Sequence, residues 1–208
     1  MSIETDLAFM ARALALAQAQ QGRTAPNPAV GCVLVRDGVV IAQAATGDGG
    51  RPHAEETALD LLGGKAKGAV AYVTLEPCGA RSSGAAGCSE RLIAAGVSRV
   101  VCAIADPHPH GAGGFARLEE AGVPVLGGVG EAEARALYEA FFHRVETGAA
   151  LGFIAPDATG FEAELTLDQG ESLVAALQRL GGQGFSRVYA KPESPAALAL
   201  KQAQPHRF

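Results

Sequence analysis

Helix-like and strand-like segments alternate between residues 54 and 147, and this alternation restricts the possible folds more than any other feature. The predicted segments are helices at 54–62, 89–95, 114–121 and 131–147, separated by strands at 69–75, 99–105 and 123–126. Strands that are separated by helices usually pair in parallel through crossover connections. We therefore expect a sheet with parallel pairing that is covered by helices.

One helix and two strands are predicted ahead of this region. The helix is expected over residues 6–21, with Thr5 as its cap. Strands are expected over 29–36 and 39–45, joined through Asp37-Gly38, which is a strong hairpin signal. Together these segments predict an α/β fold with three α/β/α layers and a five-stranded mixed sheet containing one antiparallel hairpin. In such sheets, functional sites gather beyond the carboxyl ends of the strands.

The pattern changes after Thr147-Gly148, which predicts two domains, at residues 1–148 and 149–208. The second part has a weaker succession of strand, helix, strand and helix, predicted at 161–167, 171–180, 186–190 and 195–204. It is short for an independent catalytic domain. We expect it to form a short C-terminal α/β extension.

The charge and the hydrophobic pattern exclude several classes of partner. The chain has 208 residues and a net charge of −5, without the basic clusters of a nucleic-acid-binding protein. It lacks the run of about 18 apolar residues that a membrane helix needs. Residues 1–6 carry two acidic and no basic side chains, unlike a secretory signal. The expected protein is cytoplasmic, with a small-molecule substrate and neither nucleic acid nor membrane as a partner.

The four cysteines fall into two kinds. Cys32 and Cys102 lie in apolar, strand-like runs, where a free cysteine is usually a small core residue. Cys78 and Cys88 instead lie at the two ends of a loop rich in glycine, serine and alanine. In a reducing compartment this second pair is expected to serve metal binding or catalysis.

His53-Ala54-Glu55 lies at a predicted helix start and supplies the other groups of a candidate metal site. Each helical residue advances about 100°, so His53 and Glu55 point in different directions and do not bind one metal together. His53, Cys78 and Cys88 would give zinc three protein ligands and leave a fourth position open, as in catalytic sites. Glu55 would then be the proton carrier that zinc deaminases use beside the metal.

Four sequence segments resemble the deaminase half of the bifunctional riboflavin-biosynthesis deaminase/reductase, within the cytidine-deaminase-like superfamily. They are Asn27-Pro28-Ala29-Val30-Gly31, His53-Ala54-Glu55, Thr74-Leu75-Glu76-Pro77-Cys78 and Leu92-Ile93-Ala94-Ala95-Gly96-Val97. The resemblance covers about residues 5–148 and implies the cytidine-deaminase-like fold. It also implies a zinc-dependent hydrolase that deaminates a phosphoribosylated diaminopyrimidinone by acting on an exocyclic C–N bond. The assembly implied is a homo-oligomer, a dimer or a tetramer.

The resemblance also assigns candidate substrate contacts. It places Asn27 against the ribose and the helix start at Ala54 against the base, while Thr46 stands where a family histidine is expected. The loop between the cysteines departs from the family pattern: it has nine residues and lacks the family's histidine and Pro-Pro. Arg81 and Ser82 in this loop are candidates for a phosphate cradle, since arginine suits phosphate, and a solvated loop is an equal alternative.

Two other functions stay open because of this altered loop. One is deamination of another base, nucleoside or nucleotide by the same chemistry. The other is a catalytically silent zinc-binding interaction module, although a purely structural site would have no use for Glu55. Residues 149–208 have only a faint likeness to the family's reductase half and no glycine-rich phosphate motif. We expect a truncated or degenerate reductase remnant without reductase activity.

Overall fold

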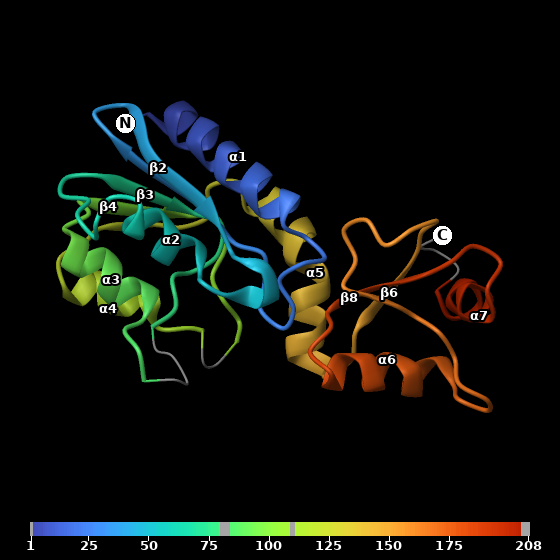
Figure 1. Ribbon diagram of the computed structural model, residues 1–208. Coiled ribbons are helices and arrows are strands. Elements are labelled where there is room, and N and C mark those ends of the chain that lie inside the picture. Colours follow the sequence, from blue (N-terminus) through green and yellow to red (C-terminus); the bar gives the residue numbers. More distant parts are fainter. Residues whose placement is uncertain (1, 80–83, 109–110, 205–208) are drawn as a thin grey trace. The chain divides into compact units, whose positions relative to one another are not determined.

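The structure is a computed structural model that describes residues 2–79, 84–108 and 111–204 (Figure 1). The chain divides into two compact units. The first unit comprises Met1–Gln20, Ala29–Gly47 and Arg51–Leu137. The second comprises Gln21–Pro28, Asp48–Gly50 and Tyr138–Phe208.

A five-stranded mixed sheet forms the centre of the first unit and confirms the predicted fold class. Its strands, in the order β2-β1-β3-β4-β5, are β2 (Val39–Ala45), β1 (Gly31–Arg36), β3 (Val70–Val73), β4 (Arg99–Cys102) and β5 (Val125–Leu126). β1 and β2 form the hairpin predicted from Asp37-Gly38, and both turn residues have positive φ. The pairs β3–β4 and β4–β5 are parallel.

A second antiparallel pairing, between β1 and β3, was not predicted. The first crossover connection leads from β2 to β3, so we expected β3 to pair in parallel. β3 instead lies on the other side of β1, which runs opposite to β2. This arrangement places β1, β3 and β4 in the interior of the sheet and leaves β2 at an edge.

Helices cover both faces of this sheet, as the three-layer prediction requires. They are α1 (Ile3–Ala19), α2 (Ala54–Asp60), α3 (Cys88–Ala95), α4 (Gly114–Glu120) and the first part of α5 (Glu131–Thr147). Figure 1 shows α1 on one face and α2, α3 and α4 on the other. Adjacent residues of β1 point to opposite faces of the sheet. Gly31 faces α1, because a Cβ on it would lie 1.9 Å from the Ala13 carbonyl oxygen. Cys32 faces α2, because the Glu55 carboxylate of that helix raises the pKa of its thiol.

The first helix begins earlier than predicted, and Thr5 is not its cap. α1 begins at Ile3, and the Ser2 hydroxyl accepts a hydrogen bond from the Thr5 backbone N–H at 3.4 Å. Ser2 and Thr5 are both residue types that favour this position. The cap at Ser2 adds a turn whose acidic residues Glu4 and Asp6 suit the positive end of the helix dipole.

Asp6 is the buried charge that joins α1 to the sheet. Its carboxylate accepts a hydrogen bond from the Tyr72 hydroxyl at 2.7 Å, on β3. It also forms an ion pair with the Arg99 guanidinium of β4 at 2.7 Å. A buried carboxylate is tolerated only when it is paired and hydrogen-bonded, so these contacts fix how α1 lies on the sheet.

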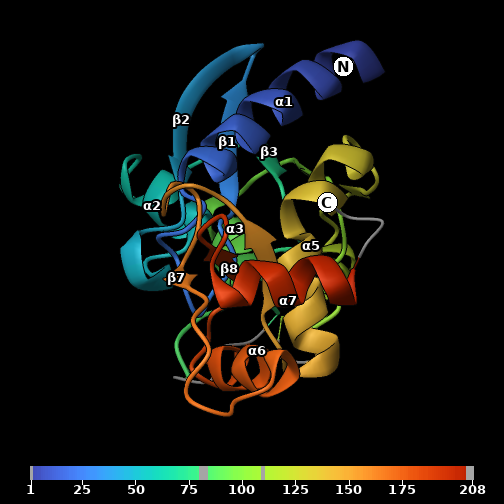
Figure 2. The ribbon, with the colours of Figure 1, turned by 90° about the vertical axis from the view of Figure 1, so that its right-hand side faces the viewer.

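The second unit contains a smaller, fully parallel sheet in the order β6-β8-β7. Its elements are β6 (Leu151–Ile154), β7 (Ala163–Glu164), α6 (Leu173–Gly182), β8 (Arg187–Ala190) and α7 (Pro195–Ala203), and they are visible in Figure 2. Val188 and Ala190 of β8 enter the core with α6 and α7. Arg187 alternates with them, and its guanidinium lies 4.0 Å from the Phe153 ring centroid.

Two strand predictions for this unit were wrong. β6 was not predicted, because its four residues follow α5 after a short turn and contain a glycine. The strand expected at 161–167 is reduced to the two residues of β7, because only Ala163 and Glu164 pair with β8. Within the described part of the chain, none of the helices combines the length and apolar character needed to cross a membrane.

Replacing Asp6 with alanine is expected to lower the free energy of unfolding by about 3 kcal/mol, because Arg99 loses its buried partner. Chemical denaturation followed by circular dichroism measures this change. Glu4→Ala, at an exposed position of the same helix, is the matched control and should change stability little. Equal effects of the two substitutions would contradict the role assigned to Asp6.

Candidate metal centre

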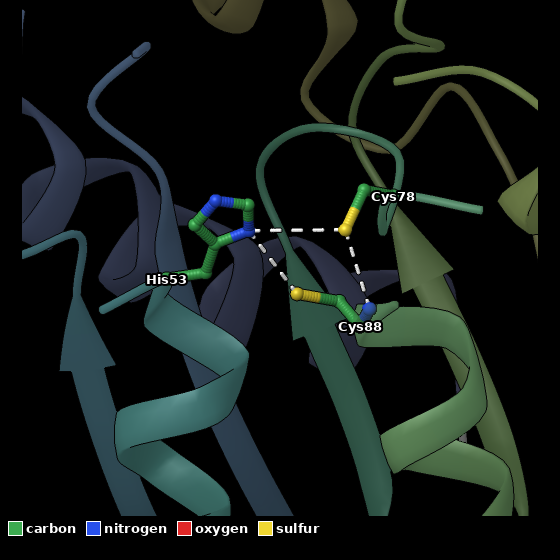
Figure 3. A group of neighbouring side chains, drawn as sticks. All are labelled: His53, Cys78 and Cys88. Atoms are coloured by element: carbon green, nitrogen blue, oxygen red, sulfur yellow. Dashed lines mark hydrogen bonds between the residues drawn. The ribbon is translucent and has the colours of Figure 1, made fainter. Parts of the chain in front are cut away.

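His53, Cys78 and Cys88 come together at one end of the first unit's sheet (Figure 3). His53 immediately precedes α2, Cys78 follows β3, and Cys88 is the first residue of α3. The His53 Nδ1 atom lies 3.3 Å from the Cys88 Sγ and 3.8 Å from the Cys78 Sγ. The Cys88 backbone N–H donates to the Cys78 Sγ at 3.2 Å. The structure thus brings together the three residues that the sequence predicted as ligands.

The spacing of these three ligand atoms fits a tetrahedral zinc ion. They all lie within 4.8 Å of one another. Zinc–sulfur and zinc–nitrogen distances near 2.3 and 2.0 Å place a thiolate and an imidazole nitrogen about 3.5 Å apart in a tetrahedron. The observed separations of 3.3 and 3.8 Å lie on either side of this value. One imidazole and two thiolates also leave a fourth coordination position open.

Cys78 differs from Cys32 and Cys102 in its electrostatic environment. Hydrogen bonds from Cys88, and then from His53, hold the pKa of the Cys78 thiol well below its usual value, which favours a thiolate. Burial raises the pKa of both Cys32 and Cys102, and the nearby Glu55 carboxylate raises each further. These two thiols stay protonated and pack in the core, whereas Cys78 has the character of a metal ligand.

α2 and α3 both begin with a capping box. The Glu56 carboxylate accepts the backbone N–H of His53 at 3.2 Å, and the Glu90 carboxylate accepts that of Gly87 at 3.1 Å. In each case a glutamate at the third helical position satisfies a backbone donor at the helix start. Arg91 of α3 then reaches across to Glu56 of α2 at 3.0 Å. The two helix starts are therefore held together as one platform.

Glu76 fixes the loop that carries Cys78. This carboxylate accepts three backbone N–H groups, from Asp106 at 3.2 Å, Gly113 at 3.0 Å and Phe115 at 3.1 Å. It thus joins the end of β3 to the loop after β4 and to the start of α4. A Cβ on Gly114 would lie 1.7 Å from the Pro77 carbonyl oxygen, so the two backbones approach more closely than any other residue permits.

Glu55 lies in the first turn of α2, buried beside the ligands with an exposed fraction of 3%. Burial raises the pKa of its carboxyl, and hydrogen bonding to its own backbone N–H and the nearby His53 act in the opposite direction. A carboxyl in this position can take up a proton and release it again during a reaction. The arrangement has the groups needed for proton transfer beside a metal.

The other sequence-predicted site residues are distributed differently. Ala54 is buried as the first residue of α2. The Thr46 hydroxyl bonds to the backbone of Val30, accepting its N–H at 2.9 Å. Asn27 belongs to the second unit, where its side-chain amide donates to the Gly50 carbonyl at 2.9 Å. Arg81 and Ser82 lie outside the described residues.

Comparison with known proteins places these features in a family. Residues 3–104 match the family model described as the cytidine and deoxycytidylate deaminase zinc-binding region. The diaminohydroxyphosphoribosylaminopyrimidine deaminase of Buchnera aphidicola is 38% identical over 144 residues, which cover 69% of this chain and 97% of that protein. The chain belongs to this zinc-binding deaminase family. Its members hydrolyse C–N bonds of pyrimidines, and the metal of the family is zinc.

Longer relatives of this deaminase family match over part of their length. The riboflavin biosynthesis protein RibD of Escherichia coli is 49% identical over 141 residues, or 67% of this chain. This match spans only 38% of the E. coli protein. The solved structure of RibD from Acinetobacter baumannii matches 82% of this chain and 48% of that chain, with 36% identity and a TM-score of 0.68.

A second solved structure matches almost the whole chain in fold. It is the deaminase/reductase of Thermotoga maritima, with a TM-score of 0.84, 22% identity, and coverage of 97% of this chain and 84% of that one. The shared fold thus includes the C-terminal part. At 22% identity the match shows a common fold and no common function.

Sequence reasoning missed the residues that hold the ligand loops in place: Glu56, Glu76, Glu90 and Arg91. For Glu56 and Glu90 a signal existed, since each follows a helix start by three residues. Glu76 gave no local signal, because its partners lie 30 to 39 residues away in the sequence.

Cys78→Ser and Cys88→Ser are each expected to lose bound zinc, whereas Cys32→Ala should retain about one zinc ion per chain. A serine hydroxyl is not deprotonated at neutral pH and is a much poorer zinc ligand than a thiolate. Metal analysis of proteins purified without chelators measures the difference. Equal zinc content in the three proteins would contradict the ligand assignment.

Glu76→Gln is expected to destabilise the fold by about 2 kcal/mol and to weaken zinc binding, because an amide NH₂ would face backbone donors. Thermal unfolding and zinc titration measure the two effects. Glu119→Gln, at an exposed position of α4, is the matched control. If the two variants behaved alike, Glu76 would not be what holds the Cys78 loop.

Proposed function

We propose that this chain catalyses the hydrolytic deamination of a phosphoribosylated diaminopyrimidinone in riboflavin biosynthesis. The observation that supports this proposal best is the buried Glu55 beside a His53, Cys78 and Cys88 set that fits zinc. The proposal is also supported by the Buchnera relative, which carries the pyrimidine deaminase name and which this chain covers over 97% of its length. The chain spans less than half of the E. coli relative, so the substrate of this chain is a proposal.

The chemistry follows from the residues around the open coordination position. A zinc ion held there supplies a Lewis acid that lowers the pKa of a water molecule to about 7. Glu55 accepts a proton from the attacking water and delivers it to the ring nitrogen. Glu55 then takes the second proton from the hydroxyl that the attacking water has become and gives it to the exocyclic amine. The C–N bond breaks, ammonia leaves and the hydroxyl becomes the carbonyl, so one water is consumed for each ammonia released. The buried position of Glu55 limits proton exchange with bulk water.

Substrate recognition in this proposal rests on the family resemblance. The buried start of α2 at Ala54 would face the base, and Asn27 would contact the ribose. Arg81 and Ser82 would contact the phosphate. Thr46 is the weakest of these assignments, since its hydroxyl is already bonded to Val30.

Zinc-loaded protein is expected to release ammonia from the diaminopyrimidinone ribose phosphate of the riboflavin pathway. Ammonia production and the change in ultraviolet absorbance of the ring measure the reaction. Glu55→Gln should lower kcat by about 10² to 10⁴, the usual contribution of a general acid–base group, while zinc content stays unchanged. An undiminished rate in Glu55→Gln would contradict the assigned proton transfer.

A second candidate function is the same reaction on another base, nucleoside or nucleotide. It is favoured by the nine-residue loop between Cys78 and Cys88, which lacks the family's histidine and Pro-Pro. Cytidine, deoxycytidylate and the pathway compound should be assayed with one zinc-loaded preparation. Turnover of a nucleoside, without ammonia from the pathway compound, would favour this second function. A zinc-loaded protein that turned over none of them would favour a non-catalytic zinc module.

We also propose a homo-oligomer, a dimer or a tetramer, as the family resemblance implies. Exposed apolar side chains of the first unit, Ile3 and Leu7 on α1 and Val39 on β2, are consistent with burial in such an assembly. Light scattering coupled to size-exclusion chromatography determines the state. The cytoplasmic location and the absence of a nucleic-acid partner remain predictions.

A further inference from the structure

Two short connections of the deaminase fold belong to the second unit. Gln21–Pro28 joins α1 to β1, and Asp48–Gly50 lies between β2 and His53. The second of these ends only three residues before the metal ligand His53. Both connections therefore belong to the same compact unit as the C-terminal part of the chain, and both lead directly into elements of the zinc site.

Arg144 of α5 bridges the first connection to β8. Its Nη2 donates to the Pro26 carbonyl at 2.7 Å, and its Nε donates to the Ser186 hydroxyl at 2.8 Å. Ser186 is buried, and its backbone N–H donates to the Glu162 carboxylate. Glu162 also accepts the Arg187 N–H at 3.1 Å. Burial raises the pKa of the Glu162 carboxyl, while the backbone hydrogen bonds from Arg187 and Ser186 and the charge of Arg144 act in the opposite direction.

Two glycines allow the C-terminal part to approach this connection at backbone distance. A Cβ on Gly22 would lie 2.6 Å from the Phe161 backbone nitrogen, and a Cβ on Gly184 would lie 2.7 Å from the Pro26 Cβ. Both glycines have positive φ, at 83° and 92°. A larger residue at either position would push residues 21–28 away from the C-terminal part, so this packing requires both glycines.

The first connection in turn holds the second. The Asn27 amide donates to the Gly50 carbonyl at 2.9 Å, and the Gly49 N–H donates to the Arg23 carbonyl at 2.8 Å. An ion pair joins Arg23 and Asp48 at 2.7 Å. A chain of contacts thus runs from β8 through Arg144 to 21–28 and on to 48–50.

We propose that residues 149–208 serve as a scaffold that sets the conformation of these two connections, with Arg144 as the positioning residue. This inference rests on the proposed function, in which Asn27 on the first connection contacts the substrate ribose. It assigns a role in substrate binding to residues 149–208. The ligands and Glu55 belong to the first unit, so loss of Arg144 affects substrate binding before zinc or proton transfer.

Arg144→Met in the full-length chain is the direct test, because methionine keeps much of the apolar stem and removes the N–H donors. We expect KM for the pathway compound to rise about tenfold with kcat and zinc content unchanged, as for lost uniform binding. Arg144→Lys keeps the charge near Glu162 but cannot bridge both acceptors, so its KM should be intermediate. Arg135→Met, on the exposed surface of the same helix, is the matched control.

Hydrogen exchange of the backbone amides separates this inference from the proposed function. Arg144→Met should speed exchange in 21–28 and 48–50 about tenfold, whatever the substrate, with α2 and α3 unchanged. This result together with an inactive wild-type enzyme would support the scaffold and overturn the function. Unchanged exchange in both connections, or a loss of kcat without a change in KM, would overturn the scaffold.

Ser186→Ala provides the same test if Arg144→Met fails to fold. It removes only the hydroxyl that accepts from Arg144 and leaves the backbone bonds of β8 in place. Faster exchange in 21–28, in the same direction as for Arg144→Met, is the expected result. Exchange at the wild-type rate would overturn the bridge through Ser186.

Discussion

Two sulfur atoms and an imidazole nitrogen lie within 4.8 Å of one another at the end of a strand and at the starts of two helices. Each of these positions is irregular backbone, with N–H groups that no regular helix or strand satisfies. Glu56 and Glu90 accept backbone N–H groups at the two helix starts. Glu76, beyond the end of the strand, accepts N–H groups of the loop after β4 and of the start of α4. The neighbouring Glu55 differs because it is buried near the core thiols and has a raised pKa. Thus three carboxylates hold the ligand platform, and a fourth has the properties of a proton carrier.

The features that sequence predicted correctly were those with a local signal. The Asp37-Gly38 turn, the alternation of helices and strands and the three ligands all follow from short patterns. Errors arose where the outcome depends on distant partners. β6 and β7 exist because β8 pairs with both, and the antiparallel neighbour of β3 is determined by the position of β1 in the sheet. Glu76 belongs to the same group, because its three donors come from residues far along the chain.

The second unit includes more of the chain than residues 149–208. The second unit contains Tyr138–Phe208, but also the connections 21–28 and 48–50. Its core is apolar and continuous around Val188, Leu180 and Leu200, so these residues form a packed structure even though the chain lacks a dinucleotide motif. The likeness in fold to the Thermotoga protein, over 97% of this chain, includes this part.

Under the proposed function, chemistry and substrate recognition would be supported by different parts of the chain. The ligands and Glu55 are held by the carboxylates of Glu56, Glu76 and Glu90 and by the two helix starts, so their positions follow from the packing of the first unit. Asn27 lies on a connection whose conformation is determined by Arg144, Gly22 and Gly184. A change in the C-terminal part can alter this connection without disturbing the platform. In such a molecule, the residues that contact the substrate can change while the residues of the deamination chemistry stay the same. The loop between Cys78 and Cys88, which departs from the family pattern in length and in residues, is consistent with this separation.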